Sequence, residues 1–168
     1  WALGCMQMAD IWRLGADRNL ERAVIGRRTS ENEVDLLLLL EDDAPETERQ
    51  PIDLPAAPPV RRAGEPSAVE LLEAIREWVD TGVKAKSAGR EKFMAAVAMN
   101  ALGMLIREAE NPVDPHDAAL SAKLLEGRAS LATPGLLPKL RATMLAKLAN
   151  DSPKYASLAA AKARWLKG

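Results

Sequence analysis

The sequence predicts an all-α protein: a helical bundle of about five helices, preceded by about three further helical segments and a Pro-rich linker. Two observations carry this prediction. Helix-forming residues are prominent, with Ala, Leu, Glu, Lys and Arg frequent and Ile and Thr scarce. Apolar residues recur with a helical period, and no stretch shows the two-residue alternation of a half-buried strand. At 168 residues, 48% of them hydrophobic, the chain is long enough for the core of an ordinary domain.

Prolines divide the chain into two parts. Six of the eleven prolines fall within the segment 44–66, where no helical period survives. Proline fixes φ and removes a backbone donor, so an extended linker is expected there. Ile52 and Leu54 are the linker residues that could rest in a surface groove. The expected division is an N-terminal helical part at 1–43, a linker at 44–65 and a C-terminal helical domain at 66–168.

Charge is distributed unevenly between these parts. The whole chain has a net charge of −1 and a pI of about 6.0, so a general nucleic-acid binder, which needs a basic excess, is not expected. Residues 1–43 hold five basic and nine acidic side chains, whereas residues 67–168 hold fifteen and eleven. The last thirty residues hold seven basic side chains and one acidic side chain, Asp151. This basic region suits either a phosphate group or an acidic protein surface such as 1–43.

The N-terminal part is expected to form the helical segments that precede the bundle. The first ends near Leu14, and its apolar face should lie against the helical domain, another chain or a missing domain. That face consists of Trp1, Leu3, Cys5, Met8 and Ile11. A second helix is expected at 18–27. Ser30 and Glu33 have the spacing of a capping box, which would open a third helix. The inward residues of the third helix are Val34, Leu37, Leu38 and Leu40.

A second capping box, Ser67 with Glu70, opens the C-terminal domain. It predicts a helix that runs to Val83 with an inward apolar stripe. The stripe is Leu71, Leu72, Ile75, Val79 and Val83. A longer helix is expected at 90–110. Its apolar face is Phe93, Val97, Ala101, Met104 and Leu105.

Three more helices complete the predicted domain. Asp114, Pro115 and Asp117 have the pattern of a helix start, and that helix should end near Gly127. The stretch "LLPKLRATMLAKLAND" predicts the next helix. Its inward residues are Leu137, Leu140, Met144, Leu145 and Leu148. Ser152 is expected to cap the last helix. Tyr155, Leu158 and Trp165 lie along it.

The motifs of common enzyme chemistries are missing from the sequence. It has no P-loop spacing, no Cys or His pair for zinc and no Ser-His-Asp set, so no catalytic residue and no metal ligand are assigned. Cys5 is the single cysteine, which excludes an intramolecular disulfide and fits a cytoplasmic location. The single histidine, His116, is expected in the first turn of a helix. No apolar run is long enough to span a membrane, and no signal-peptide pattern is visible.

Four residues are candidates for contact with a ligand or partner: Arg90, Asn100, Arg141 and Lys147. Asn100 interrupts an apolar helix, where a buried amide would need a partner, and a neighbouring helix is favoured over a ligand. Arg90 near a helix start, and Arg141 with Lys147 on a later helix, suit phosphate, although a solvated face is the simpler explanation. Charge reversal at Arg141 and Lys147 is expected to weaken the activity that this domain supports, without unfolding the domain.

The stretch "LERAVIGRRTSENEVDLLLLLE" resembles the C-terminal end of aminoglycoside phosphotransferase-like kinases, in particular those linked to acyl-CoA dehydrogenases. In that family a "GRR…SE.E.DLL" segment closes the helical C-lobe. The resemblance covers residues 1–43. The catalytic Asp, the metal-binding residues and the nucleotide-gripping Lys of the family lie upstream of this segment, so none is carried over to this chain.

Three further stretches, "ELLEAIREWV", "REKFMAAVAMNAL" and "LRATMLAKLANDSPKY", resemble a small helical family of unknown function. Its members occur beside those kinases or fused to them. The resemblance covers residues 66–160, and the four candidate residues fall within it. Met94 stands where many relatives have His, so no role of that His is assigned here.

Together the resemblances imply a non-catalytic C-terminal part or accessory module of a phosphotransferase, assisting ATP-dependent phosphorylation of a small hydroxylated acyl-CoA substrate. ATP and Mg are implied for the partner kinase lobe, and no cofactor is assigned to this chain. The expected partners are the kinase catalytic domain, in the same or a separate chain, and the acyl-CoA; a homo-oligomer is left open, and neither nucleic acid nor a membrane is expected. The alternative is a purely structural protein-interaction module with no ligand contact.

Overall fold

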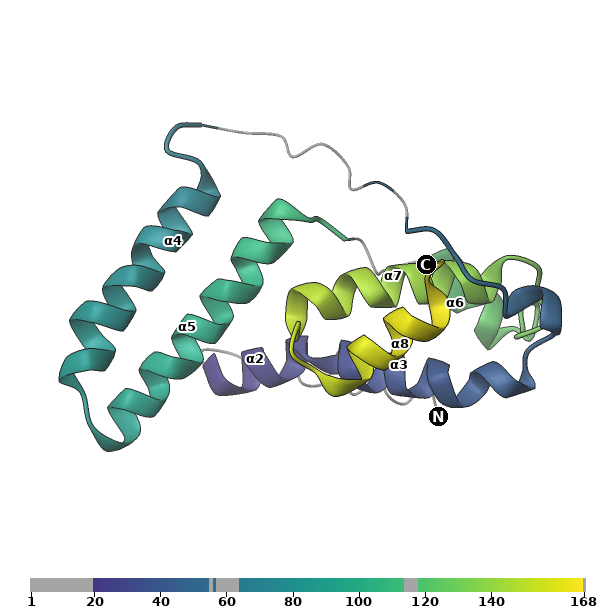
Figure 1. Ribbon diagram of the computed structural model, residues 1–168, viewed down its shortest axis with the longest axis horizontal. Helices are drawn as coiled ribbons and strands as arrows, with labels where there is room; N and C mark the ends of the chain where they lie inside the picture. Colours follow the sequence, from purple (N-terminus) through teal and green to yellow (C-terminus); the bar gives the residue numbers. More distant parts are fainter. Residues whose placement is uncertain (1–19, 55, 57–63, 114–117, 168) are drawn as a thin grey trace. The chain divides into compact units, whose positions relative to one another are not determined.

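The computed structural model describes residues 20–54, 56, 64–113 and 118–167, and these form an all-α fold, as predicted (Figure 1). The α-helices are α2 (Leu20–Arg27), α3 (Thr29–Leu40), α4 (Ala68–Trp78), α5 (Gly89–Glu110), α6 (Ala118–Leu125), α7 (Leu136–Asp151) and α8 (Ala156–Trp165). Within the described ranges no strand forms, and Ile52 and Leu166 make an isolated parallel bridge. No helix of these ranges is both long enough and apolar enough to cross a bilayer.

Two compact units make up the chain, and neither follows the division that the prolines predict. The first unit contains α2, α4 and α5. The second unit contains α3, the segment that follows it as far as Ala56, and α6 to α8. Each unit therefore combines helices from both sides of the Pro-rich segment. The first half of the expected linker is part of the second unit.

In the first unit, α4 begins with the predicted capping box. The Ser67 Oγ accepts a hydrogen bond from the Glu70 amide (3.3 Å), and the Ser67 amide donates to the Glu70 carboxylate (2.7 Å). A π-helical turn at Val79–Val83 and a 3-10 turn at Lys84–Lys86 lead into α5, which packs against both α4 and α2. The buried apolar side chains of this unit, among those described, are Val24, Val79, Ala95, Met104 and Ile106.

The second unit is built around α7, with an apolar core that also takes in residues of α3 and α8. The core residues are Val34, Leu37, Ala44, Leu137, Met144, Leu145, Leu148, Leu158, Ala161 and Trp165. The expected inward faces of α3 and α7 are confirmed at nearly every position, with Leu38 and Leu140 packed against the same core. This agreement follows from the helical period, because residues three and four apart share a face.

The segment after α3 is not a free linker. It forms 3-10 turns at Glu41–Asp43 and Glu46–Glu48, and Ala44 between them is buried. The Ile52 amide then donates to the Trp165 carbonyl oxygen (2.7 Å), at the end of α8. Ile52 is half-buried, so this part of the predicted linker does rest on a helical surface.

Two predicted helix caps are wrong. Ser30 lies inside the first turn of α3, and its buried hydroxyl donates to the Asp151 carboxylate (2.9 Å) instead of capping. Ser152 follows the end of α7, and α8 begins at Ala156 with Tyr155 at the N-cap position. The predicted helix ending at Leu14, and the predicted helix start with Asp114 and His116, fall outside the described residues.

Candidate functional site

Arg141 is completely buried in α7. Its guanidinium forms a salt bridge with Glu41, and Nη1 donates to the backbone carbonyl oxygens of Glu48 (3.2 Å) and Gln50 (3.4 Å). The guanidinium carbon also lies 5.5 Å from the centre of the Trp165 ring, within cation–π range. Burial lowers the pKa of Arg141 below its ordinary value, and the nearby Glu41 carboxylate opposes that shift. Arg141 therefore contacts protein on all sides and presents no group to a ligand.

The Glu41 carboxylate is the centre of this cluster. Glu41 is 3% exposed. In addition to its salt bridge with Arg141, its carboxylate accepts a hydrogen bond from Trp165 Nε1 (3.0 Å) and forms an ion pair with Arg164 Nε (2.7 Å). Arg164 also reaches the neighbouring Asp42 (3.1 Å). A carboxylate buried to this degree needs several donors to offset the loss of water, and the basic end of α8 supplies them.

Glu48 occupies the N-terminus of α7. One carboxylate oxygen accepts from the Gly135 amide (2.9 Å), where Gly135 has the positive φ of +75° that suits glycine. Helix N-termini attract anions, and here the chain's own carboxylate takes that position. The second Glu48 oxygen and Arg141 Nε are buried without a hydrogen-bond partner.

Lys147 is also engaged with carboxylates. Its Nζ lies 3.2 Å from Glu33 and 3.6 Å from Asp151, and its side chain is 18% exposed. The Tyr155 hydroxyl donates a hydrogen bond to another carboxylate of α3, that of Asp35 (2.7 Å). The basic C-terminal region was expected either to hold phosphate or to dock on an acidic segment. Within the second unit, Arg141 and Lys147 dock on the acidic segment that begins with α3.

Arg90 and Asn100 both lie on α5 in the first unit. The Arg90 side chain is 75% exposed and pairs with Glu21 of α2 (2.8 Å). Asn100 is exposed, which corrects the expectation of a buried amide. Its neighbours in the sequence are apolar, but the Asn100 side chain itself is exposed. Neither unit brings all four predicted site residues together.

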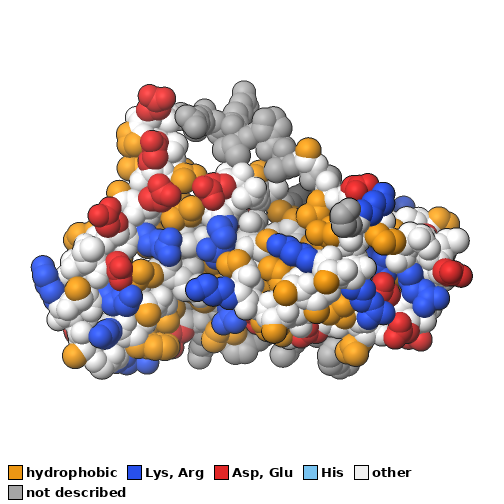
Figure 2. All heavy atoms as spheres, viewed as in Figure 1, with side chains coloured by type: hydrophobic (Ala, Val, Ile, Leu, Met, Phe, Trp, Pro, Cys, Tyr) orange, Lys and Arg blue, Asp and Glu red, His pale blue; other side chains and the backbone are white. Residues whose placement is uncertain are grey.

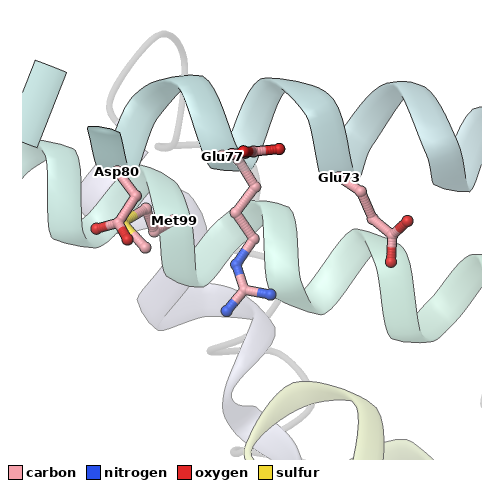
Figure 3. A pocket seen from close by; sticks show the side chains of 5 residues that line it. Glu73, Glu77, Asp80 and Met99 are labelled. Atoms are coloured by element: carbon pink, nitrogen blue, oxygen red, sulfur yellow. The ribbon is translucent and has the colours of Figure 1, made fainter. Parts of the chain in front are cut away.

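A shallow cavity of about 290 Å³ lies between α4 and α5. Figure 3 shows Glu73, Glu77 and Asp80 spaced along one helix, with Met99 contributed by the other. Arg76 completes the lining. Carboxylates outnumber the one guanidinium, so the cavity repels phosphate groups. The described residues also contain no group of three or more His, Cys, Asp or Glu side chains that could hold a metal ion.

A row of large apolar side chains on α4 is exposed: Leu71 is 51% exposed, Ile75 48% and Trp78 63%. Their spacing of four and then three residues places them on one face, which we call the open face of α4. Gly82 contributes to this face, because a Cβ there would lie 3.1 Å from the Trp78 indole. The indole therefore lies directly over the glycine backbone.

The open face corrects part of the predicted inward stripe. Val79 is buried as expected, but Leu71 and Ile75 are about half exposed. On α5, Phe93 (54%) and Leu105 (40%) of the predicted apolar face are likewise exposed. In the sequence, Trp78 is the residue that could have indicated this exposure, because it widens the apolar face of α4 beyond what a single neighbouring helix can cover.

The fold and contacts define an all-α protein in which an acidic segment after α2 is held by basic residues of α7 and α8. Residues 85–155 match the model of a domain of unknown function, DUF6285. The match begins in the turn before α5 and ends just before α8, so it contains all four predicted site residues but not the open face of α4. No curated protein and no solved structure matches the chain.

Proposed function

We propose that this chain is a non-catalytic accessory module, or C-terminal part, of a cytoplasmic phosphotransferase that resembles hydroxyacyl-CoA kinases. In this proposal it assists the ATP-dependent phosphorylation of a small hydroxylated acyl-CoA substrate by binding the kinase lobe. The phosphotransferase partner is implied by the resemblance of the sequence. The mode of action, contact with protein and not with the substrate, is supported by the geometry.

The observation that carries the mode of action is the open face of α4. Leu71, Ile75 and Trp78 expose an apolar row, and Trp is among the residue types enriched at the energetic centres of protein interfaces. The candidate phosphate ligands give the complementary argument. Arg141 is buried and Lys147 is paired with two carboxylates, so binding a phosphate would first require breaking contacts that hold the second unit together.

A binding experiment tests this function. A kinase catalytic domain of the family that residues 1–43 resemble, with an "HGD…N" catalytic loop, is co-purified with the full chain. Ile75→Glu is expected to weaken the complex about tenfold or more, because it places a charge in an apolar contact. Leu39→Glu is the matched control, since Leu39 is 74% exposed on α3 and carries the same change elsewhere. Undiminished binding by Ile75→Glu would refute the role of the open face.

Thermal-shift titration separates protein contact from ligand contact. A ligand that binds the native state raises the melting temperature. Because the proposal places no ligand contact on this chain, we expect the melting temperature of the chain alone to stay constant when acyl-CoA esters or ATP are added. A rise with acyl-CoA would favour direct substrate contact over the mode of action proposed here.

A further inference from the structure

We propose that α7 and α8 form a docking surface for an acidic peptide segment of a partner protein, and that this chain covers the surface with its own residues 41–53. We call these residues the strap. The strap and the helices that hold it belong to the second unit, so this docking surface is separate from the open face of α4.

The strap-binding surface is a set of hydrogen-bond donors and cations that contact one short acidic segment. Its members are the Gly135 amide, Arg141, Arg164, the Trp165 indole and Lys167. Each of them contacts a carboxylate of the strap, and these carboxylates belong to Glu41, Asp42, Glu48 and Asp53. Figure 2 shows basic and acidic side chains next to each other around the C-terminal end that Figure 1 marks. This complementarity selects for an acidic occupant.

The strap is also held through its backbone, as a bound peptide is. The Ile52 amide donates to the Trp165 carbonyl oxygen (2.7 Å), and the Lys167 amide donates to the Ile52 carbonyl oxygen (3.4 Å). Arg141 donates to two further carbonyl oxygens of the strap. Peptide-binding sites commonly take affinity from main-chain hydrogen bonds and selectivity from the positions of a few side chains. The strap is held in both ways.

The apolar core of the second unit takes little from the strap. Ala44 is the strap residue in the buried core, and the other core residues come from α3, α7 and α8. Two buried atoms at the contact, Glu48 Oε2 and Arg141 Nε, have no hydrogen-bond partner among the described residues, which costs free energy. A partner segment in place of the strap would leave most of the core intact, and a carboxylate that reached Arg141 Nε would remove one of these costs.

Tethering explains why the chain covers this surface by itself. A segment joined to its own site has an effective concentration on the order of millimolar. A free segment that makes the same contacts therefore competes poorly with the strap. A partner segment binds when its contacts exceed those of the strap, so the strap excludes acidic peptides that bind weakly.

A labelled peptide with the strap sequence, EDDAPETERQPID, tests the proposal on the full chain. The double variant Glu41→Gln with Glu48→Gln weakens the strap and leaves every residue of the strap-binding surface unchanged. Fluorescence anisotropy should show that the peptide binds this variant at least tenfold more tightly than the wild type. Ile52→Pro removes one backbone donor of the strap without altering the buried ion pair, and it should also bind the peptide more tightly than the wild type. Equal binding to all three chains, or binding to none, would overturn the proposal.

Two altered peptides of equal net charge separate specific docking from simple charge attraction. One carries Glu41→Gln with Glu48→Gln. The other carries Asp43→Asn with Glu46→Gln, at two positions that are exposed in the strap. The first peptide should bind the double variant at least tenfold more weakly than the second. Equal affinities would mean that charge alone attracts the peptide, and would overturn the proposal.

Substitutions on α8 locate the site. In the double variant, Arg164→Gln should weaken peptide binding, because Arg164 contacts two strap carboxylates. Lys162→Gln removes the same charge from an exposed position of the same helix and should leave binding unchanged. Equal losses from the two substitutions would contradict the assigned surface. Displacement of the peptide by inorganic phosphate as readily as by unlabelled peptide would identify a general anion site, and would equally overturn the proposal.

The two proposals fail separately. Ile75→Glu, which tests the open face of α4, should leave peptide binding unchanged. If Ile75→Glu disrupts the complex with the kinase domain and the strap peptide binds none of the chains, the proposed function stands and the docking surface on α7 and α8 is wrong.

Discussion

At the scale of single residues, Arg141 and Glu41 form a deeply buried ion pair in the second unit. Both side chains are almost inaccessible to water, and the positive charge of Arg141 offsets the negative charge of Glu41. Removing Arg141 leaves the buried Glu41 carboxylate with Arg164 and Trp165 as its remaining partners, and removing Glu41 takes the carboxylate partner from a buried guanidinium. The charge reversal at Arg141 that the sequence alone predicted to be harmless to the fold is therefore expected to unfold the second unit.

Arg141→Met should lower the free energy of unfolding by about 3 kcal/mol, the lower end for breaking a buried ion pair, because Arg164 and Trp165 still contact the Glu41 carboxylate. Urea denaturation followed by circular dichroism measures the change. Arg128→Met is the control: Arg128 pairs with Glu126 but its side chain is 59% exposed, and the loss should stay below about 1 kcal/mol. Equal losses in the two variants would show that the buried pair contributes no more than a surface one.

The double variant Arg141→Met with Glu41→Gln gives a second measure of the same pair. Once the carboxylate is neutral, the Met substitution should cost less than it does alone, so the two effects should not add. Additive losses would mean that Arg141 acts mainly through the carbonyl oxygens of Glu48 and Gln50 and through Trp165.

At the scale of elements, two similar Ser-x-x-Glu patterns have different fates. Ser67 caps α4, and both reciprocal hydrogen bonds of the box are present. Ser30 has the same Ser-x-x-Glu spacing, but its hydroxyl donates to Asp151, which lies 121 residues further along the chain. A capping box is a local pattern and can be found from sequence. A long-range partner that takes the hydroxyl cannot.

Ser67→Ala should destabilise the first unit by about 1 kcal/mol through loss of the cap. Hydrogen exchange should show the effect first at the amides of the initial turn of α4, including Glu70, whose amide donates to the Ser67 hydroxyl (3.3 Å). Amides of α7 serve as the internal control in the same experiment. Unchanged exchange at the start of α4 would mean that the Glu70 side chain alone holds this end.

The inward faces show the same limit of sequence reasoning. The apolar period of α7 has a core on its inner side, so Leu137, Leu145 and Leu148 were predicted correctly. The period of α4 is just as clear, yet Leu71 and Ile75 remain exposed. Periodicity shows that a face is apolar, but it does not show whether the same chain supplies the helix that covers it. The prediction that Asn100 is buried was wrong for a related reason, because apolar neighbours in sequence do not by themselves bury a residue.

At the scale of the whole molecule, the proline count predicted a division that the units do not follow. Prolines exclude helix, but they do not exclude packing, and the segment after α3 is packed through Ala44, Glu48 and Ile52. The charge split between the two parts of the sequence was the better guide. The acidic excess of 1–43 and the basic excess of the C-terminal part meet as ion pairs within the second unit, from Lys147 with Glu33 to Arg164 with Asp42.

This arrangement predicts that a chain cut between Ala56 and Gly64 stays together. The N-terminal fragment would keep α2 packed on α5 in the first unit, and α3 with the following segment packed on α7 in the second. A protease site inserted between these residues, followed by size-exclusion chromatography after cleavage, tests this. We expect co-elution of the fragments in native buffer and separation in urea, because apolar burial and the buried ion pair hold them without the connecting bond. The cut chain that also carries Arg141→Met should separate at a lower urea concentration than the cut wild type. Separation of the wild-type fragments in native buffer would show instead that the Pro-rich segment marks a true domain boundary, as the sequence alone predicted.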